Sequence, residues 1–361
     1  MSSIVYGGLD VHKEFITACL VDSNTGEVYT EQVMNDRAKV LKAVEGWRKL
    51  GELHLCYEAG GCGYVLHRWL ASVGVRCDVI APSLIPKAPG DKIKTDRRDA
   101  RQLARFYGAG MLHKVRVPDE EQEAVRALVR QREELTADIV RQKNRIIKYL
   151  RTLGQIYTRG NNWTKTHRRW LKGVEIASLP REILDNHLSQ LASTEELRQK
   201  VSERIEEIAQ TEPYRELVER LKCLRGIKTQ TAMVLVTEIG DIWRFGKAGE
   251  LMSYFGLVGR ENSSGGKRKT GSITKCGSGR VRRALTEAAW QQRRKENVSD
   301  RLKKQWSSQP EEVVEIARKA QKRLHRKYMK VSEKHDHRVA VTAVAREMTG
   351  FVWAILRAEF A

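Results

Sequence analysis

The sequence predicts an α/β domain at the N-terminus, a helical middle region and a mainly helical C-terminal part. Within residues 1–115, apolar residues alternate between a period of two and a period near 3.6, whereas the later chain shows mainly the helical period. Basic residues gather at the end, since residues 216–361 hold 31 Lys and Arg against 16 Asp and Glu. We therefore expect three domains, at residues 1–115, 116–215 and 216–361.

Eight elements are expected in the N-terminal domain, in the order β-β-β-α-β-α-β-α. The expected strands are short apolar runs at residues 4–9, 15–21, 27–33, 53–57 and 76–80. The expected helices have apolar residues at helical spacing over residues 39–50, 65–73 and 97–107. Residues 22–26 (Asp-Ser-Asn-Thr-Gly) form a hairpin signature between the second and third strands. Three antiparallel strands followed by α/β units is the order typical of the ribonuclease H-like fold.

Two helices with heptad spacing are expected in the middle region. Residues 118–153 are predicted to form one long helix whose apolar seam consists of Val125, Leu128, Leu135, Ile139, Ile146, Tyr149 and Leu153. The second helix has its apolar residues at Leu197, Val201, Ile205 and Ile208. The pair indicates a coiled coil, within the chain or between chains. A plain helical hairpin buried in one protomer is the alternative.

A basic segment with two Trp residues lies between these helices, at residues 157–170. Arg and Lys beside an aromatic ring can bind phosphates while the ring stacks on bases. We therefore predict nucleic-acid contact by Trp163, Arg168 and Arg169. The alternative is a loop that its Trp residues anchor to the protein.

The C-terminal part begins with an apolar helix, a turn that contains Gly226, and a second apolar helix over residues 231–239. This pattern resembles a helix-hairpin-helix, whose turn offers N–H groups to a phosphate. Further helices are expected over residues 251–258, 281–290 and 293–330. A Gly/Ser loop is expected at residues 259–275. The basic residues predicted to contact nucleic acid here are Lys228, Arg260, Lys267, Arg268, Lys269, Lys275, Arg282 and Arg283.

Four acidic residues occupy positions that suit a metal-dependent nuclease. Asp10 and Glu58 close the first and fourth expected strands, and Asp96 and Asp99 are three apart in an expected helix, so they share one side of it. Carboxylates from two strand ends and one helix can converge on a hard cation, Mg²⁺ or alternatively Mn²⁺. We predict that these four residues bind the metal and are catalytic in phosphodiester chemistry. His12 can reach the same region, but a packed or exposed side chain is the expectation.

Ser263 and Ser264 are a second candidate for chemistry. A hydroxyl beside flexible Gly residues and among Arg and Lys can approach a phosphate closely. Its attack would form a phosphoserine link and free a hydroxyl at the DNA break, so strands could be rejoined without ATP. From the loop alone, a structural role is the more common one.

Composition limits the remaining possibilities. The formal net charge of +21 indicates a polyanionic partner, most often nucleic acid. The six Cys residues form no C-x-x-C pair, so neither a zinc site nor a disulfide framework is expected. We find no signal-peptide pattern and no apolar run near the ~20 residues of a membrane span. A cytoplasmic protein without a membrane partner is expected.

Three motifs with the predicted acids resemble those of the DEDD insertion-sequence transposases, the bridge-RNA-guided recombinases. They are residues 8–13 (Gly-Leu-Asp-Val-His-Lys), 57–60 (Tyr-Glu-Ala-Gly) and 94–100 (Lys-Thr-Asp-Arg-Arg-Asp-Ala). The C-terminal part is similar to the transposase domain of that family at residues 224–227, 238–241, 254–257, 263–265, 273–275 and 282–285.

The resemblance implies a domain like a Holliday-junction resolvase, with Asp10, Glu58, Asp96 and Asp99 on Mg²⁺, and a C-terminal transposase domain that supplies a nucleophilic serine. The family's serine directly precedes a Gly, which corresponds to Ser264, although Ser263 stays open.

The resemblance also implies a set of partners. They are donor and target DNA, a structured guide (bridge) RNA, and further copies of the chain in a dimer or tetramer with a composite site between protomers. Residues 155–190 form a longer insertion than expected of compact members. A hydrolytic junction resolvase and a non-catalytic RNA- or DNA-binding protein remain as alternatives.

Overall fold

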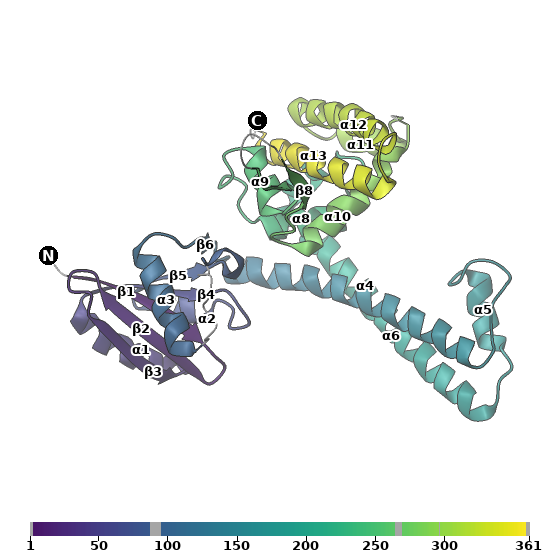
Figure 1. The fold of residues 1–361 in the computed structure, drawn as a ribbon. Coiled ribbons are helices and arrows are strands. Elements are labelled where there is room, and N and C mark those ends of the chain that lie inside the picture. The colour runs from purple at the N-terminus through teal and green to yellow at the C-terminus, as the bar shows by residue number, and fades with distance from the viewer. Residues whose placement is uncertain (1–2, 87–94, 264–268, 296, 359–361) are drawn as a thin grey trace. The chain divides into compact units, whose positions relative to one another are not determined.

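The computed structural model describes residues 3–86, 95–263, 269–295 and 297–358 (Figure 1). The chain divides into two compact units, Met1–Pro118 and Asp119–Ala361. The division lies three residues after the boundary that the sequence predicts between residues 115 and 116.

Within the described residues, the first unit is built on a six-stranded mixed sheet in the order β3-β2-β1-β4-β5-β6. The strands are β1 (Ile4–Val11), β2 (Phe15–Asp22), β3 (Val28–Met34), β4 (Glu52–Glu58), β5 (Arg76–Ile80) and β6 (Lys114–Val115). β2 runs antiparallel to β1 and β3, β4 is parallel to β1 and β5, and β6 is antiparallel to β5. All five expected strands are present, and the arrangement is consistent with the predicted ribonuclease H-like fold. The two-residue β6 was not expected, because so short a run has no readable period.

Helices cover both faces of this sheet. The helices are α1 (Arg37–Trp47), α2 (Val65–Ser72) and α3 (Asp96–Gly108). α1 and α2 pack their apolar residues on one face, in a cluster that includes Val44, Leu70 and the β1 residue Leu9. α3 packs across β1 and β2 on the other face, where Leu103 and Tyr107 meet Cys56 (Figure 1). Successive residues of β1 therefore belong to different cores.

The predicted long helices form a hairpin within one chain. α4 (Glu120–Thr152) packs along α6 (Ser178–Ile208), and α5 (Lys165–Gly173) lies at the far end of the pair (Figure 1). A small apolar cluster closes that end, formed by Ile139, Ile146, Leu150, Leu171, Val174, Leu184 and Leu191. The apolar seam of α4 therefore packs against α6 of the same chain in this structure.

The near end of the hairpin shares its core with the C-terminal helices. Val125 and Val129 of α4 and Val201 and Ile205 of α6 lie in the same apolar cluster as α8 (Thr229–Ile239). Residues 116–215 and 216–361, expected as separate domains, therefore contribute to one unit from Asp119 onward. One charged pair adds to this junction, since Arg130 donates to both carboxylate oxygens of the buried Glu238 at 2.7 and 3.0 Å.

The C-terminal helices surround α8, which is buried from Ala232 to Ile239. The other helices are α7 (Tyr214–Leu221), α9 (Ala248–Tyr254), α10 (Gly279–Ala289), α11 (Asp300–Trp306), α12 (Glu311–Ser332) and α13 (His337–Arg357). Two expectations were wrong in detail. The helix expected over residues 251–258 is α9 and ends earlier, and the single tail helix expected over residues 293–330 is broken into α11 and α12, since Pro310 precedes α12.

The expected loop at residues 259–275 also contains regular structure. β7 (Gly259–Glu261) and β8 (Thr270–Ile273) pair as an antiparallel hairpin. Gly and Ser are poor strand formers, so composition concealed this element.

α13 corrects the expectation that no run is long and apolar enough to span a membrane. Its 21 residues include a window of mean hydropathy 1.5, and by length and composition it passes that test. Arg346 and Glu347 interrupt the run and concealed it in the sequence. Half of the window is buried inside the structure, where Val344, Met348 and Val352 belong to the C-terminal core. α13 is thus accounted for as the core helix of its unit.

The predicted helix-hairpin-helix segment corresponds to α7, a turn and α8. Gly226 in the turn has φ +90°, and a Cβ there would lie 2.4 Å from the carbonyl oxygen of Ala288 in α10. The turn therefore needs glycine both for its backbone conformation and for its contact with α10. Its contact with phosphate stays a prediction.

Candidate active site

Two parallel strands present the predicted acids on one face of the sheet. Tyr6, Gly8 and Asp10 alternate with core residues along β1, so they share the face that α3 covers. Leu9 is paired with Tyr57 of β4, and Asp10 and Glu58 each follow by one residue. The sequence predicted one acid at the end of each of these strands. The register places the two acids on adjacent strands and on the same face of the sheet.

Gly8 lets α3 lie directly on β1. A Cβ atom at this position would lie 2.1 Å from the carbonyl oxygen of Ala100 and 2.6 Å from the amide nitrogen of Ala104. Both neighbouring atoms belong to the helix backbone, which cannot avoid the clash by a change of rotamer as a side chain can. The small side chains of Ala100 and Ala104 are fully buried at this contact. The distance between helix and strand is thus fixed by the lack of a side chain two residues before Asp10.

The start of α3 places Asp96 over the same face. Thr95 caps the helix, since its hydroxyl accepts a hydrogen bond from the amide of Arg98. Asp96 begins the helical stripe that continues through Ala100, Leu103 and Tyr107, and this stripe faces the sheet. The carboxylate of Asp96 therefore extends the buried face of α3 toward the end of β1.

These elements bring three side chains together. The Nε2 atom of His12 lies 3.2 Å from Oδ2 of Asp10 and 3.4 Å from Oδ1 of Asp96. One ligand atom from each of the three residues lies within 4.8 Å of the other two. His12 was expected to be packed or exposed without this contact. It is half exposed, and it follows Asp10 by two residues, a spacing that keeps side chains on one side of an extended chain.

The pKa of the Asp10 carboxyl is raised, chiefly by burial and further by neighbouring negative charge. Burial raises the pKa of its carboxyl above the ordinary value, His12 acts against this by charge and by hydrogen bond, and the charges of Asp96 and Asp99 raise the pKa further. The Asp10 side chain is 23% exposed. A carboxylate held in such surroundings gains from a nearby cation.

The other two predicted acids lie nearby but outside this group of three. Glu58 ends β4 and is exposed, and Asp99 lies one turn into α3, where its charge acts on Asp10. The structure therefore unites Asp10 with Asp96, adds His12, and leaves Glu58 on the neighbouring strand.

The donor atoms suit a divalent cation. Carboxylate oxygens are the preferred ligands of hard ions such as Mg²⁺, and imidazole nitrogen is acceptable to Mn²⁺. Atoms separated by up to about 4–5 Å can surround a single ion of this kind. The raised pKa of Asp10 is a second sign, because burial, its main cause, and the charges of Asp96 and Asp99 all disfavour the ionised carboxylate, which a bound cation would stabilise.

A polar cavity of about 480 Å³ opens beside Asp96. It is lined by side chains from β2, β3 and the start of α3, among them Thr17, Thr30, Gln32 and Arg97. Hydroxyl, amide and guanidinium groups are the donors that bind phosphate and sugar oxygens. The cavity therefore offers room for a nucleic-acid backbone next to the acids.

The serine candidates belong to the β7–β8 hairpin of the second unit. Ser263 is exposed, and its hydroxyl donates to Oε1 of Glu261 at 2.9 Å. Ser264 lies outside the described residues, as do Lys267 and Arg268.

Two glycines fix the base of this hairpin. A Cβ at Gly256 (φ +66°) would lie 2.1 Å from the carbonyl oxygen of Cys276, and one at Gly277 (φ +73°) would lie 2.0 Å from that of Tyr254. Arg282 of α10 donates to the carbonyl oxygens of Phe255, Cys276 and Gly277 at 2.9–3.1 Å. Contacts between backbone atoms therefore hold the hairpin on α10, and Arg282 takes part in them.

The tip of the hairpin formed by α4 and α6 uses its aromatic residues internally. The half-buried Trp163 ring has Lys143 Nζ at 5.3 Å and the Arg168 guanidinium at 5.9 Å from its centre. Arg168 also donates to both carboxylate oxygens of Glu195 at 2.9 and 3.0 Å. These contacts match the alternative interpretation, a segment anchored by its Trp residues. Arg169 is exposed, and the nucleic-acid role of all three predicted residues stays a prediction.

The predicted basic residues of the C-terminal part lie mainly at the surface. The exposed ones are Lys228, Arg260, Lys269, Lys275 and Arg283. They are available for contact with phosphate, whereas Arg282 is half buried and bonded to backbone.

Comparison with known proteins gives matches in both units. A sequence model for DEDD transposases of the IS110 type, described as a transposase, matches residues 7–154. A second model, described as the transposase IS116/IS110/IS902 family, matches residues 218–305. The first covers the acidic site and α4, and the second covers α8, the β7–β8 hairpin and α10. Neither covers α5 and α6.

Individual relatives match over most of the chain. The transposase-type protein y4qE of Sinorhizobium fredii is 37% identical over 97% of this chain and 88% of its own length. The transposase for insertion sequence element IS1533 of Leptospira borgpetersenii is 36% identical over 92% of this chain and 98% of its own length. A pilin gene-inverting protein of Moraxella bovis is 28% identical over 78% of this chain and 81% of its own length.

Replacement of Gly8 by Ala tests how the site is held. The added methyl group meets helix backbone, so α3 must move away from β1, and we expect a loss of about 1–3 kcal/mol in the free energy of unfolding. We also expect the rise in melting temperature that Mg²⁺ or Mn²⁺ gives the parent to disappear, as measured by thermal unfolding with and without the ion.

Gly46→Ala is the matched control for this change. Gly46 lies in α1, and a Cβ there has no atom within 4 Å. This variant should be as stable as the parent or more so, because Ala favours a helix over Gly. An unchanged response to the cation in Gly8→Ala would show that the contact does not position the acids.

Proposed function

The chain belongs to the IS116/IS110/IS902 family of transposases, enzymes that catalyse DNA strand cleavage and transfer, and from this membership we propose that it recombines donor and target DNA through a covalent phosphoserine intermediate. The observation that carries the proposal is the convergence of Asp10 and Asp96 from a strand and a helix. We assign the first unit to the ribonuclease H-like class, which the strand order supports.

The acidic site is assigned to the divalent cation. Asp10 and Asp96 would hold it, with Glu58 and Asp99 beside them, and His12 would bond to the carboxylates or join the ligands of Mn²⁺. A bound Mg²⁺ or Mn²⁺ supplies charge that stabilises the phosphate oxygens of the reacting DNA. Thr17, Gln32 and Arg97 line the adjacent cavity, where they would position the sugar-phosphate backbone.

The hydroxyl of Ser264 is assigned the role of nucleophile, with Ser263 as the alternative. Its Oγ would form a bond to phosphorus while the bond from phosphorus to one DNA oxygen breaks. The serine proton is released, and the leaving oxygen takes up a proton as a free hydroxyl. Attack by a hydroxyl of another strand then reverses these bonds, which joins the new strand and restores the serine. The number of phosphoester bonds is conserved, so no ATP is needed.

A structured guide RNA is proposed as the partner that selects the DNA sites. The C-terminal basic excess, with exposed Lys228, Arg260 and Arg283, supports contact with backbones of any sequence. Base pairing by the RNA would then read the donor and target sequences. Nucleic acid that copurifies with the chain tests this part: we expect one discrete structured RNA, whereas random fragments would contradict guidance.

Assembly into a dimer or tetramer is proposed because two DNA duplexes must be held while their strands are exchanged. The apolar side chains of Val140, Leu179, Ile183 and Leu197 remain exposed on α4 and α6, which supports a further contact of this hairpin with another protomer.

Conversion of Asp10 to Asn tests the metal assignment. The change removes one negative charge at nearly constant volume, and we expect strand cleavage with Mg²⁺ to fall by at least about a thousandfold, since such a site supplies several kcal/mol. Cleavage is measured on labelled donor DNA with the copurified RNA present. Glu45→Gln removes the same charge from an exposed position on α1 and should retain parent activity. Parent-like cleavage by Asp10→Asn would remove the acidic site from the mechanism.

Separate conversion of Ser264 and Ser263 to Ala tests the covalent step. The parent should form a protein–DNA adduct that survives denaturing electrophoresis. We expect Ser264→Ala to lose the adduct and Ser263→Ala to keep it, whereas the reverse result would identify Ser263 as the nucleophile. Cleavage by both variants, with no adduct in the parent, would instead show a hydrolytic resolvase in which water attacks.

A further inference from the structure

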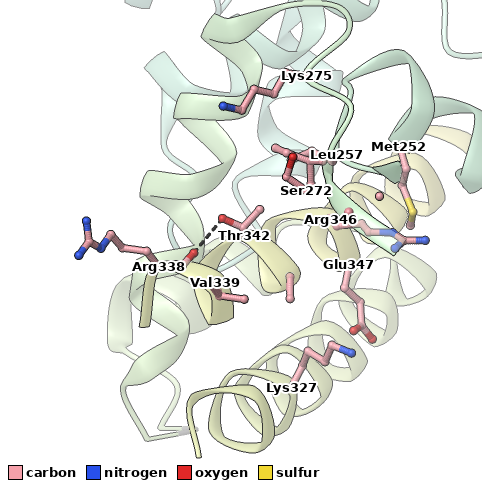
Figure 2. Close-up of a pocket in the computed structure, with 14 residues that line it drawn as sticks. Met252, Leu257, Ser272, Lys275, Lys327, Arg338, Val339, Thr342, Arg346 and Glu347 are labelled. Carbon is pink, nitrogen blue, oxygen red and sulfur yellow. Dashed lines mark hydrogen bonds between the residues drawn. The ribbon is translucent and has the colours of Figure 1, made fainter. Parts of the chain in front are cut away.

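A cavity of about 800 Å³ lies in the second unit (Figure 2). Its wall is formed by the end of α9, the β7–β8 hairpin, α12 and α13. Its volume is in the range of small-molecule sites, about 300–1,000 Å³. Leu257, Ile273 and Lys275 of its lining belong to segments that resemble the transposase domain, but the proposed chemistry gives the cavity no role.

The interior of the cavity is apolar. Met252, Leu257 and Val339 of α13 are among its apolar lining residues, and Figure 2 shows them around the same hollow. Val339 is 51% exposed although it is a large apolar side chain on an otherwise well-packed helix. An apolar side chain open to water inside a concavity gains free energy when a flat apolar ligand covers it.

Cationic side chains surround this surface. Lys275, Lys327, Arg338 and Arg346 line the cavity and come from three different segments (Figure 2). Glu347 also lines it, but its carboxylate is bonded to Arg323 of α12. The Nε atom of Arg338 lies 3.2 Å from Oδ1 of Asp336, so the positive charge of Arg338 is partly offset. The lining still carries an excess of positive charge, which suits an anion at the rim.

Hydroxyl groups add a third kind of contact. Ser272 of β8 lies across the cavity from Thr342, whose hydroxyl donates to the carbonyl oxygen of Arg338 at 2.8 Å and keeps its oxygen available as an acceptor (Figure 2). Such groups can bond to the edge of a base or to a sugar. An apolar centre, polar edges and a cationic rim correspond to the base, sugar and phosphate of one nucleotide.

We propose that this cavity binds an unpaired nucleotide of a nucleic-acid strand, with the base against Val339 and Met252 and the phosphates at Lys275, Lys327 and Arg346. A duplex cannot enter, because its bases are stacked and paired inside the helix. The proposal rests on the proposed function only in taking nucleic acid as the ligand. The hairpin that carries the serine loop forms part of the wall, so a strand that follows this hairpin reaches the cavity.

Matched charge variants test this assignment. Val339→Glu places a negative charge in the cavity, whereas Val65→Glu makes the same change on α2, at a valine that is 48% exposed. Glu favours a helix as well as or better than Val, so both full-length chains should fold. Fluorescence anisotropy is measured with fluorescein-labelled single-stranded DNA, single-stranded RNA of the same sequence and the DNA duplex.

We expect Val339→Glu to weaken single-strand binding about tenfold relative to Val65→Glu, the scale of one lost base contact, and to leave duplex binding equal in the two variants. The strand that loses more affinity, DNA or RNA, identifies the source of the nucleotide. Equal single-strand affinities, or an equal loss for the duplex, would overturn the proposal. A parent that binds none of the probes would overturn both this proposal and the proposed function.

A lysine pair provides a second readout. Lys327→Gln should reduce the dependence of single-strand affinity on salt by about one phosphate contact, whereas Lys330→Gln, exposed on the same helix and outside the cavity lining, should not. Equal salt dependence in the two variants would contradict a phosphate at the rim.

Discussion

The contact of the α3 backbone with Gly8 is the constraint on which the acidic site depends. A strand contributes Asp10 and a helix contributes Asp96, and only the separation of these two elements decides whether their carboxylates share a cation. That separation is set by backbone atoms of Ala100 and Ala104 lying where a side chain would otherwise stand. Because the contact joins two regular elements, the site is held on rigid supports, as a catalytic site requires.

The same contact has an electrostatic consequence. It keeps Asp10 partly buried and near the charges of Asp96 and Asp99, and burial, chiefly, together with these like charges raises the pKa of its carboxyl. Burial of Leu103 and Tyr107 against the sheet stabilises the helix in this position despite the repulsion. The second unit uses comparable means for a different purpose, since Gly256 and Gly277 bring backbone segments together and so fix the hairpin that carries the serines. In both units, two backbone segments approach so closely that only glycine fits between them. In each case a candidate functional residue, Asp10 or the serines, lies nearby in the chain.

The sequence predicted the elements whose pattern is long and regular. Period-two runs identified β1 to β5, and the heptad seam identified α4, because each pattern reflects burial on one face. The β7–β8 hairpin was missed, since Gly and Ser conceal a strand, and α13 was missed because Arg346 and Glu347 interrupt its apolar run. At the site, acids at strand ends could be recognised, but the position of His12 depends on how the chain leaves β1. The cavity beside Val339 could not be predicted, because elements distant in the sequence form it.

Direct measurement of cation binding gives the most decisive test of the account. Mn²⁺ is titrated into the full-length chain and free ion is followed by electron paramagnetic resonance, with Asp96→Asn and Glu45→Gln compared with the parent. Sharing of one ion between the strand and the helix predicts a binding site in the parent and in Glu45→Gln, weakened at least about tenfold in Asp96→Asn. Equal affinity in all three proteins would show that Asp96 does not join Asp10 around a metal, and the central claim would be contradicted.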